Sequence, residues 1–202
     1  AQYNRGLVEL AAGRWAAART ALDKASAAAP DRPDAPHAAG VVALLSGDPA
    51  AAESSFSEAQ RRAPKDELPR LGLAVARSDD AALRGLLGKG RAYDTAARVN
   101  LAAQLLARRQ SDAAQKILPA TDAGLPEAAF VRGQLAEGAG ALDDASGAFG
   151  AAVALAPHYF DALTGLGRVG VARGDFAAAR GALDRAIAIQ PDEVEPHQLL
   201  AK

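Results

Sequence analysis

The sequence contains no cysteine and no methionine, and aromatic residues make up only 4% of its 202 positions. The lack of cysteine excludes disulfide bonds, thiolate zinc sites and a cysteine nucleophile. Alanine dominates the hydrophobic half of the composition. Small side chains at so many places favour helices that approach one another closely over a core filled by bulky groups.

An excess of charge of either sign is also missing, because the formal net charge is −1. The sequence therefore has no electrostatic footprint for nucleic acid. Arg61, Arg62 and Lys65 form a short basic cluster near an expected helix end. We expect these side chains to be solvated and to compensate the helix dipole.

A long hydrophobic run is absent as well. The longest apolar stretch, Ala38–Leu45, is far shorter than the roughly 20 residues that a membrane-spanning helix needs. We expect a soluble protein without direct membrane insertion, and both the cytoplasm and the periplasm stay open as compartments. Because the sequence starts and stops inside helix-like patterns, we interpret it as a piece of a longer protein.

What the sequence does contain is a repeated phrase. Gly13–Pro30 reads GRWAAARTALDKASAAAP, Gly47–Pro64 reads GDPAAAESSFSEAQRRAP, and Gly174–Pro191 reads GDFAAARGALDRAIAIQP. Pro30 and Pro64 lie 34 residues apart, as do Pro157 and Pro191. A period of this length predicts stacked helical hairpins.

The clearest hairpin covers residues 160–191. An apolar stripe at helical spacing from Leu163 to Val171 marks its first helix, which we call helix A. Gly174 ends helix A, and Asp175 is placed to cap the second helix, helix B, by accepting from its free amides. Helix B is expected to bury a face that includes Phe176, until the closing proline stops it.

This hairpin resembles the tetratricopeptide repeat, a family that favours small, aromatic and proline residues at fixed places. The matching residues are Leu163, Leu166, Gly167, Gly174, Phe176, Ala179, Leu183, Ala186 and Pro191. The segments 1–30, 33–64 and 126–157 carry most of the same pattern, and the stretch between them matches weakly. We expect Gly167 and Ala179 to be small because helices A and B cross closest there.

The resemblance implies an all-α protein, a right-handed superhelical α-solenoid of about six helix-turn-helix hairpins plus a C-terminal helix. We expect one domain over 1–202. The expected hairpins are approximately 1–30, 33–64, 66–89, 92–118, 126–157 and 160–191, and the expected terminal helix is 193–202.

No active site can be argued from the spacing of reactive residues. The letters GLGRVG at 165–170 match a dinucleotide-binding pattern, but no strand precedes them and Gly167 already has a packing role. The three histidines, His37, His158 and His197, have no paired spacing for a metal. We expect no enzyme activity, no cofactor and no metal.

The resemblance implies instead that helix A of each hairpin lines a concave groove that holds a partner. The implied groove residues are Tyr3, Asn4, Leu7, His37, Val41, Leu44, Asn100, Ala103, Phe130, Gln134, Glu137, Asp161, Thr164 and Arg168. The N-terminal half of this groove is apolar and suits an amphipathic helix or an extended peptide, and the C-terminal half is polar. An alternative is that Val41 and Leu44 only pack between neighbouring helices.

Two ways of gripping a peptide occur in the family. A clamp of Lys and Arg for a terminal carboxylate is absent, because the matching places hold residues such as Tyr3 and Ala38. Asparagines that grip a peptide backbone through their amides are present at Asn4 and Asn100, without a continuous ladder between them.

We therefore expect a non-catalytic scaffold that binds a peptide or partner protein in its groove. Bacterial cell-envelope assembly or secretion is one setting in which such repeat proteins serve. The alternative is the recognition arm of a larger multidomain enzyme, a transferase or a protease. Self-association through the end repeats is a further option.

Overall fold

The structure is a computed structural model that describes residues 1–120 and 124–201. Over these residues the chain forms thirteen α-helices and no β-strand, so the expected all-α fold is confirmed. Residue 202, the last of the expected terminal helix, lies outside the described residues. The chain divides into two compact units, Ala1–Asn100 and Leu101–Lys202.

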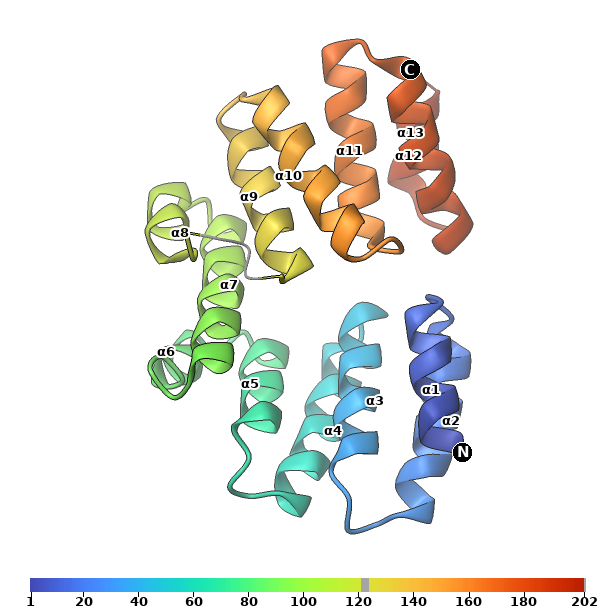
Figure 1. Ribbon diagram of the computed structural model, residues 1–202, viewed down its shortest axis with the longest axis vertical. Coiled ribbons are helices and arrows are strands. Elements are labelled where there is room, and N and C mark those ends of the chain that lie inside the picture. Colours follow the sequence, from blue (N-terminus) through green and yellow to red (C-terminus); the bar gives the residue numbers. More distant parts are fainter. Residues whose placement is uncertain (121–123, 202) are drawn as a thin grey trace. The chain divides into compact units, whose positions relative to one another are not determined.

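The first unit is built from helices that pack in chain order (Figure 1). Each helix from α1 to α5 packs against the helix that follows it, and α3 also contacts both α1 and α5. The first helices of the hairpins therefore lie next to one another in a layer. The helices are α1 (Gln2–Ala11), α2 (Trp15–Ala28), α3 (Asp34–Leu45), α4 (Pro49–Arg62), α5 (Glu67–Ala76) and α6 (Asp80–Gly85), followed by the start of α7 (Arg91–Ala107).

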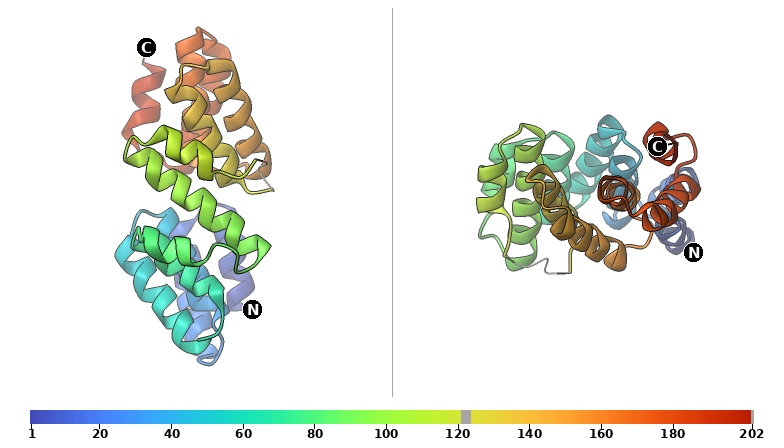
Figure 2. Two further views of the ribbon diagram at one scale, coloured as in Figure 1. Left: turned by 90° about the vertical axis from the view of Figure 1, so that its left-hand side faces the viewer. Right: turned by 90° about the horizontal axis from the view of Figure 1, so that it is seen from above.

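The second unit repeats this arrangement (Figure 2). Each helix from α9 to α13 packs against the next, and α11 also contacts both α9 and α13. Alternate helices again form a layer. After the end of α7 the unit contains α8 (Ser111–Ile117), α9 (Pro126–Gly138), α10 (Leu142–Leu155), α11 (Phe160–Arg173), α12 (Phe176–Ile189) and α13 (Val194–Leu200).

The hairpins turn at residues with a left-handed backbone. Four turns use glycine, which adopts this conformation without steric cost. In the weakly matching hairpins the same kind of turn is made by Ser78, with φ of 51°, and by Arg109, with φ of 60°. The glycines, with φ between 71° and 75°, are Gly13, Gly47, Gly140 and Gly174.

In each hairpin that matches the repeat well, a glycine on helix A faces a large side chain of helix B sixteen residues further on. A Cβ atom at any of these glycines would lie between 2.3 and 2.7 Å from the facing side chain. No real Cβ tolerates that distance, so the packing of helix on helix requires glycine there. The pairs are Gly6 with Leu22, Gly40 with Phe56, Gly133 with Phe149, and Gly167 with Leu183.

The two phenylalanines of this set also touch the following helix A. A Cβ at Gly72 would lie 2.5 Å from the ring of Phe56, and one at Gly165 would lie 2.9 Å from the ring of Phe149. Both rings are at most 1% exposed. Each phenylalanine therefore packs between the first helices of two consecutive hairpins.

Two details of the last full hairpin differ from expectation. Gly167 faces Leu183, whereas Ala179 faces Gly170, so the two small residues belong to separate contacts. Phe176 is 61% exposed, although its counterpart Trp15 packs against a buried cluster that includes Val42 of the next helix A.

Candidate functional site

The residues expected to line the groove all lie on the first helices of hairpins, and we call the side that carries them the helix-A face. Both compact units carry part of this face. In the first unit it comprises Tyr3, Asn4 and Leu7 on α1, His37, Val41 and Leu44 on α3, and Asn100 on α7. In the second unit it comprises Ala103 on α7, Phe130, Gln134 and Glu137 on α9, and Asp161, Thr164 and Arg168 on α11.

In the first unit only part of the expected set is accessible. Asn4 is exposed, and Leu7 is 37% exposed. Tyr3 packs against the buried cluster around Leu22. Val41 and Leu44 are half-buried and pack against the cluster that contains Phe56.

His37 contributes packing in this unit. Its ring centroid lies 5.3 Å from that of Phe56, at an interplanar angle of 56°. Burial lowers the pKa of the imidazole, while Asp66 and then Asp34 oppose that shift. The ring is therefore neutral at pH 7, and its Nδ1 atom has no hydrogen-bond partner among the described residues.

Asn100 uses its amide within its own helix. Its Nδ2 group donates to the carbonyl oxygen of Ala96 at 2.9 Å. This contact occupies a donor that a bidentate grip on a peptide backbone would need. Asn4 is thus the accessible asparagine of the expected pair in the first unit.

Two exposed leucines of this face were missed from the sequence. Leu45 on α3 is 46% exposed and Leu68 on α5 is 40% exposed. Both fall at places of the repeat that count as groove positions, since Leu45 directly follows Leu44 and Leu68 has the same place in α5 as Asp161 has in α11. Counting the repeat through the weak third hairpin would have found Leu68.

In the second unit the face begins with an aromatic group on α9. The ring of Phe130 lies 5.7 Å from that of Phe149 and 5.1 Å from that of Tyr159. Burial, followed by Glu127 and Asp161, raises the pKa of the Tyr159 phenol. Phe130 is half-buried by these contacts, and Gln134 and Ala103 are half-buried as well.

Arg168 forms the centre of the charged part of this face. Its Nε and Nη2 atoms donate to the two carboxylate oxygens of Glu137 at 2.5 and 2.8 Å, and its Nη1 atom donates to Oε1 of Glu195 at 2.7 Å. The hydrogen bond with Glu137 is the main cause that raises the pKa of the guanidinium. One cation therefore links α9, α11 and α13.

Asp161 and Thr164 lie one turn apart on the same side of α11 as Arg168. Asp161 is reached by water but is crowded by protein atoms, and this crowding is the first cause that raises the pKa of its carboxyl. Glu195 and Glu193 add to the rise, and Arg168 opposes it. Thr164 is 3% exposed.

Glu195 was also missed from the sequence. It lies 34 residues after Asp161 and so has the same place in α13 as Asp161 has in α11. Extending the groove register into the terminal helix would have identified it.

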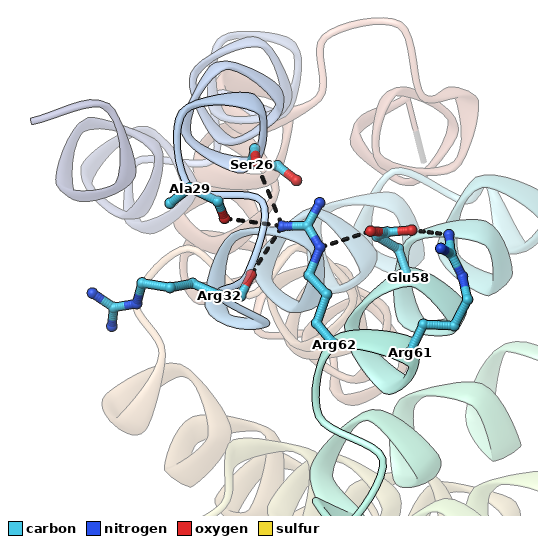
Figure 3. A network of polar contacts seen from close by, with 6 residues as sticks. All are labelled: Ser26, Ala29, Arg32, Glu58, Arg61 and Arg62. Carbon is cyan, nitrogen blue, oxygen red and sulfur yellow. Dashed lines mark hydrogen bonds and ion pairs between the residues drawn. The ribbon is translucent and has the colours of Figure 1, made fainter.

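Arg62 in the first unit is a partly buried structural residue and not the solvated one that the sequence suggested. Its side chain is 12% exposed, and its Nε atom donates to Oε1 of Glu58 at 2.7 Å. Figure 3 shows its Nη1 atom reaching three carbonyl oxygens at the end of α2 and in the loop that follows. Those acceptors, at 3.5, 3.2 and 2.9 Å, belong to Ser26, Ala29 and Arg32.

Residues 1–120 and 124–201 contain no group of three or more His, Asp or Glu side chains that could hold a metal ion. In the same part of the chain, no helix combines the length and the apolar character needed to cross a bilayer.

No curated protein sequence matches the chain. A solved structure that does resemble it is the APC/C hetero-tetramer Cut9–Hcn1, with a TM-score of 0.64 and 17% sequence identity over 98% of this chain. The match takes in 41% of the chain in that structure, so the present chain spans about two fifths of its length.

Two further solved structures match over nearly the whole length of their chains. PilW, described as a widely conserved type IV pilus biogenesis factor, has a TM-score of 0.58 and 16% identity, over 98% of this chain and 96% of PilW. PilF of Pseudomonas aeruginosa has a TM-score of 0.56 and 17% identity, over 99% of this chain and 95% of PilF. At such identities the likeness establishes the fold.

Family models agree with the hairpins that have glycine turns. A model of the tetratricopeptide repeat matches residues 3–67, which contain most of α1 and all of α2–α4. A second model with the same description matches residues 136–202, from the end of α9 through α13. The chain belongs to the tetratricopeptide repeat family.

Proposed function

We propose that the chain is a non-catalytic scaffold that holds a segment of a partner protein on its helix-A faces. The family supports a protein-interaction scaffold in general. The observation that carries the finer proposal is the layer of adjacent first helices in each unit, on which side chains stay accessible. The accessible groups are apolar in the first unit, with Leu7, Leu45 and Leu68, and charged in the second.

We further propose bacterial cell-envelope assembly or secretion as the setting. PilW supports it, because PilW is described as a type IV pilus biogenesis factor and the match covers 98% of this chain and 96% of PilW. A scaffold in such a setting would hold another envelope protein, and no chemistry on that protein is required of it.

The proposal is tested with substitutions at accessible residues. Phe130, Arg168 and Asn100 are unsuitable, because each has packing or polar contacts within the fold. Leu7→Glu places a charge on the face, and Val8→Glu is its matched control, because Val8 is 62% exposed on another side of the same helix. In the second unit Asp161→Arg is matched by Asp184→Arg on α12.

The measurement is capture of partners by the tagged chain and its four variants from a lysate of the source organism, compared by mass spectrometry. We expect a partner that both control variants retain and that Leu7→Glu or Asp161→Arg loses. A partner that all four variants retain would place binding elsewhere on the chain. Loss by the controls as well would show that a general change of charge, and not the face, explains the result.

A further inference from the structure

The helix-A face of the second unit carries more negative than positive charge. Its carboxylates are Glu137 on α9, Asp161 on α11, Glu193 at the start of α13 and Glu195 within it, and Arg168 is the cation among them. The face is therefore strongly acidic, although the chain as a whole has a net charge of only −1.

Arg168 cannot satisfy all of these carboxylates. Its Nε and Nη2 atoms are both used by Glu137, and its Nη1 atom is used by Glu195. Within the described part of the chain, neither Asp161 nor Glu193 has a hydrogen bond or ion pair with a cation. Among the described residues, Arg168 is thus the one cation beside the carboxylates of Asp161, Glu193 and Glu195.

The close approach of these carboxylates destabilises the ionised form of Asp161. Glu195 and Glu193 lie close enough to raise the pKa of its carboxyl, in addition to the effect of crowding. Because the folded pKa lies above the unfolded one, ionised Asp161 disfavours the folded state at neutral pH. Folding alone would favour a neutral side chain at this position.

Thr164 supplies an independent observation at the same place. It is 3% exposed, and its Oγ1 atom has no hydrogen-bond partner among the described residues. Buried hydroxyls are nearly always paired, and in a helix the carbonyl one turn earlier is the usual acceptor. Thr20 does this, donating to the carbonyl oxygen of Ala16 at 3.0 Å. Thr164 leaves its hydroxyl unused on the side of α11 that carries Asp161 and Arg168.

A cationic ligand would account for both the carboxylates without an ion pair and the unpaired hydroxyl beside them. We propose that the acidic face of α11 and α13 binds a basic segment of the partner protein, with a Lys or Arg side chain seated against Asp161, Glu193 and Glu195. An ammonium or guanidinium group would form charge-assisted hydrogen bonds with Asp161 and Glu193, which have no ion pair within the described part of the chain, and with Glu195, which shares Arg168 with Glu137. This inference rests on the proposed scaffold function and specifies the chemistry of the partner.

The test measures binding of two fluorescein-labelled peptides, acetylated and amidated, to the full chain by anisotropy at low salt. One peptide alternates Ala with Lys and Arg, and the other has Glu at every basic place. The variant Asp161→Asn with Glu195→Gln removes two charges from the face. Its control, Asp143→Asn with Asp184→Asn, removes two charges from helices α10 and α12 and so has the same net charge.

We expect the chain to bind the basic peptide and not the acidic one, and the face variant to weaken binding by about tenfold or more. The control should weaken binding far less. Equal weakening by both variants, or no preference for the basic peptide, overturns the inference.

If the capture experiment with Leu7→Glu succeeds while the basic peptide fails to bind, the scaffold function stands and only this inference falls.

Discussion

A Cβ atom at residue 133 would lie 2.5 Å from Cδ1 of Phe149, and the ring cannot move away, because Gly165 of the next hairpin approaches its other side. The pair Gly133 and Phe149 thus fixes how closely α9 and α10 pack. Its equivalents recur in the other well-formed hairpins, so the same contact sets the geometry of each repeat.

Gly133→Ala should destabilise the fold by about 1–3 kcal/mol, because the added methyl group overpacks a filled site. Gly147→Ala on α10 is the matched control, since nothing lies within 4 Å of a Cβ there. The control should stabilise by about 0.5–1 kcal/mol, because alanine is the better helix former. Chemical denaturation followed by far-UV circular dichroism measures both. Similar values for the two variants would contradict the packing argument.

The turn at Arg109 offers a stabilising substitution. A left-handed backbone costs a residue with a side chain about 1–2 kcal/mol, and glycine avoids this cost at the price of a more flexible unfolded chain. Arg109→Gly should therefore raise the free energy of unfolding by roughly 0.5–1 kcal/mol. Arg109→Ala keeps the unfavourable backbone and should bring no gain. Thermal melting distinguishes the two variants, and an equal melting temperature would refute the assignment of strain.

Arg62 and Arg61 form a natural pair for comparison, because both contact Glu58, but the side chain of Arg62 is 12% exposed and that of Arg61 is 74% exposed. Arg62→Ala should cost about 1.5–3 kcal/mol, because it removes the charge-assisted hydrogen bonds of one guanidinium to Glu58 and to three carbonyl oxygens. Arg61→Ala should change stability by less than about 0.5 kcal/mol, as expected of an exposed ion pair. Urea unfolding monitored by the fluorescence of Trp15, which lies in the same unit, provides the measurement.

His37 should make the first unit sensitive to acid. Burial holds the pKa of its folded state below the ordinary value of 6.5, so the unfolded chain binds a proton more readily. The contribution of the neutral His37 ring to the free energy of unfolding is therefore complete above pH 6.5 and is lost as the pH falls below that value. His37→Phe, the side chain found at the same place in α9, should reduce this loss.

The measurement is the midpoint of Trp15 fluorescence melting between pH 7.5 and pH 5. The exposed His158 on the second unit gives the control, because His158→Gln should leave the acid response of the Trp15 signal unchanged. An unaltered response in His37→Phe would show that another group is responsible.

The repeat pattern predicted the fold well because its signals are local. The glycine turn is needed within a single hairpin. So is the pair formed by a small residue on helix A and a large residue sixteen positions later. The turns at Ser78 and Arg109 were harder to recognise, because tertiary packing holds a left-handed conformation that neither residue favours by itself.

The candidate site was only partly predictable. Position in the repeat identifies the helix face on which Asn100 or Thr164 lies, but it does not say whether the side chain bonds its own helix or stays unpaired. Arg62 was misjudged for a similar reason, since its three acceptors lie thirty or more residues earlier in the chain. Contacts between hairpins depend on rotamers that no pattern of letters records.

Because Phe149 packs between Gly133 and Gly165, the three positions are expected to evolve together. A mutation that shrinks the ring leaves space on two sides, so two glycines 32 positions apart become free to gain side chains together. In related sequences, residues 133, 149 and 165 should therefore change as a set of three. If a gene duplication copied a segment whose length differs from the repeat period, a phenylalanine at the junction would keep the glycine of its own hairpin and lose the glycine of the next one.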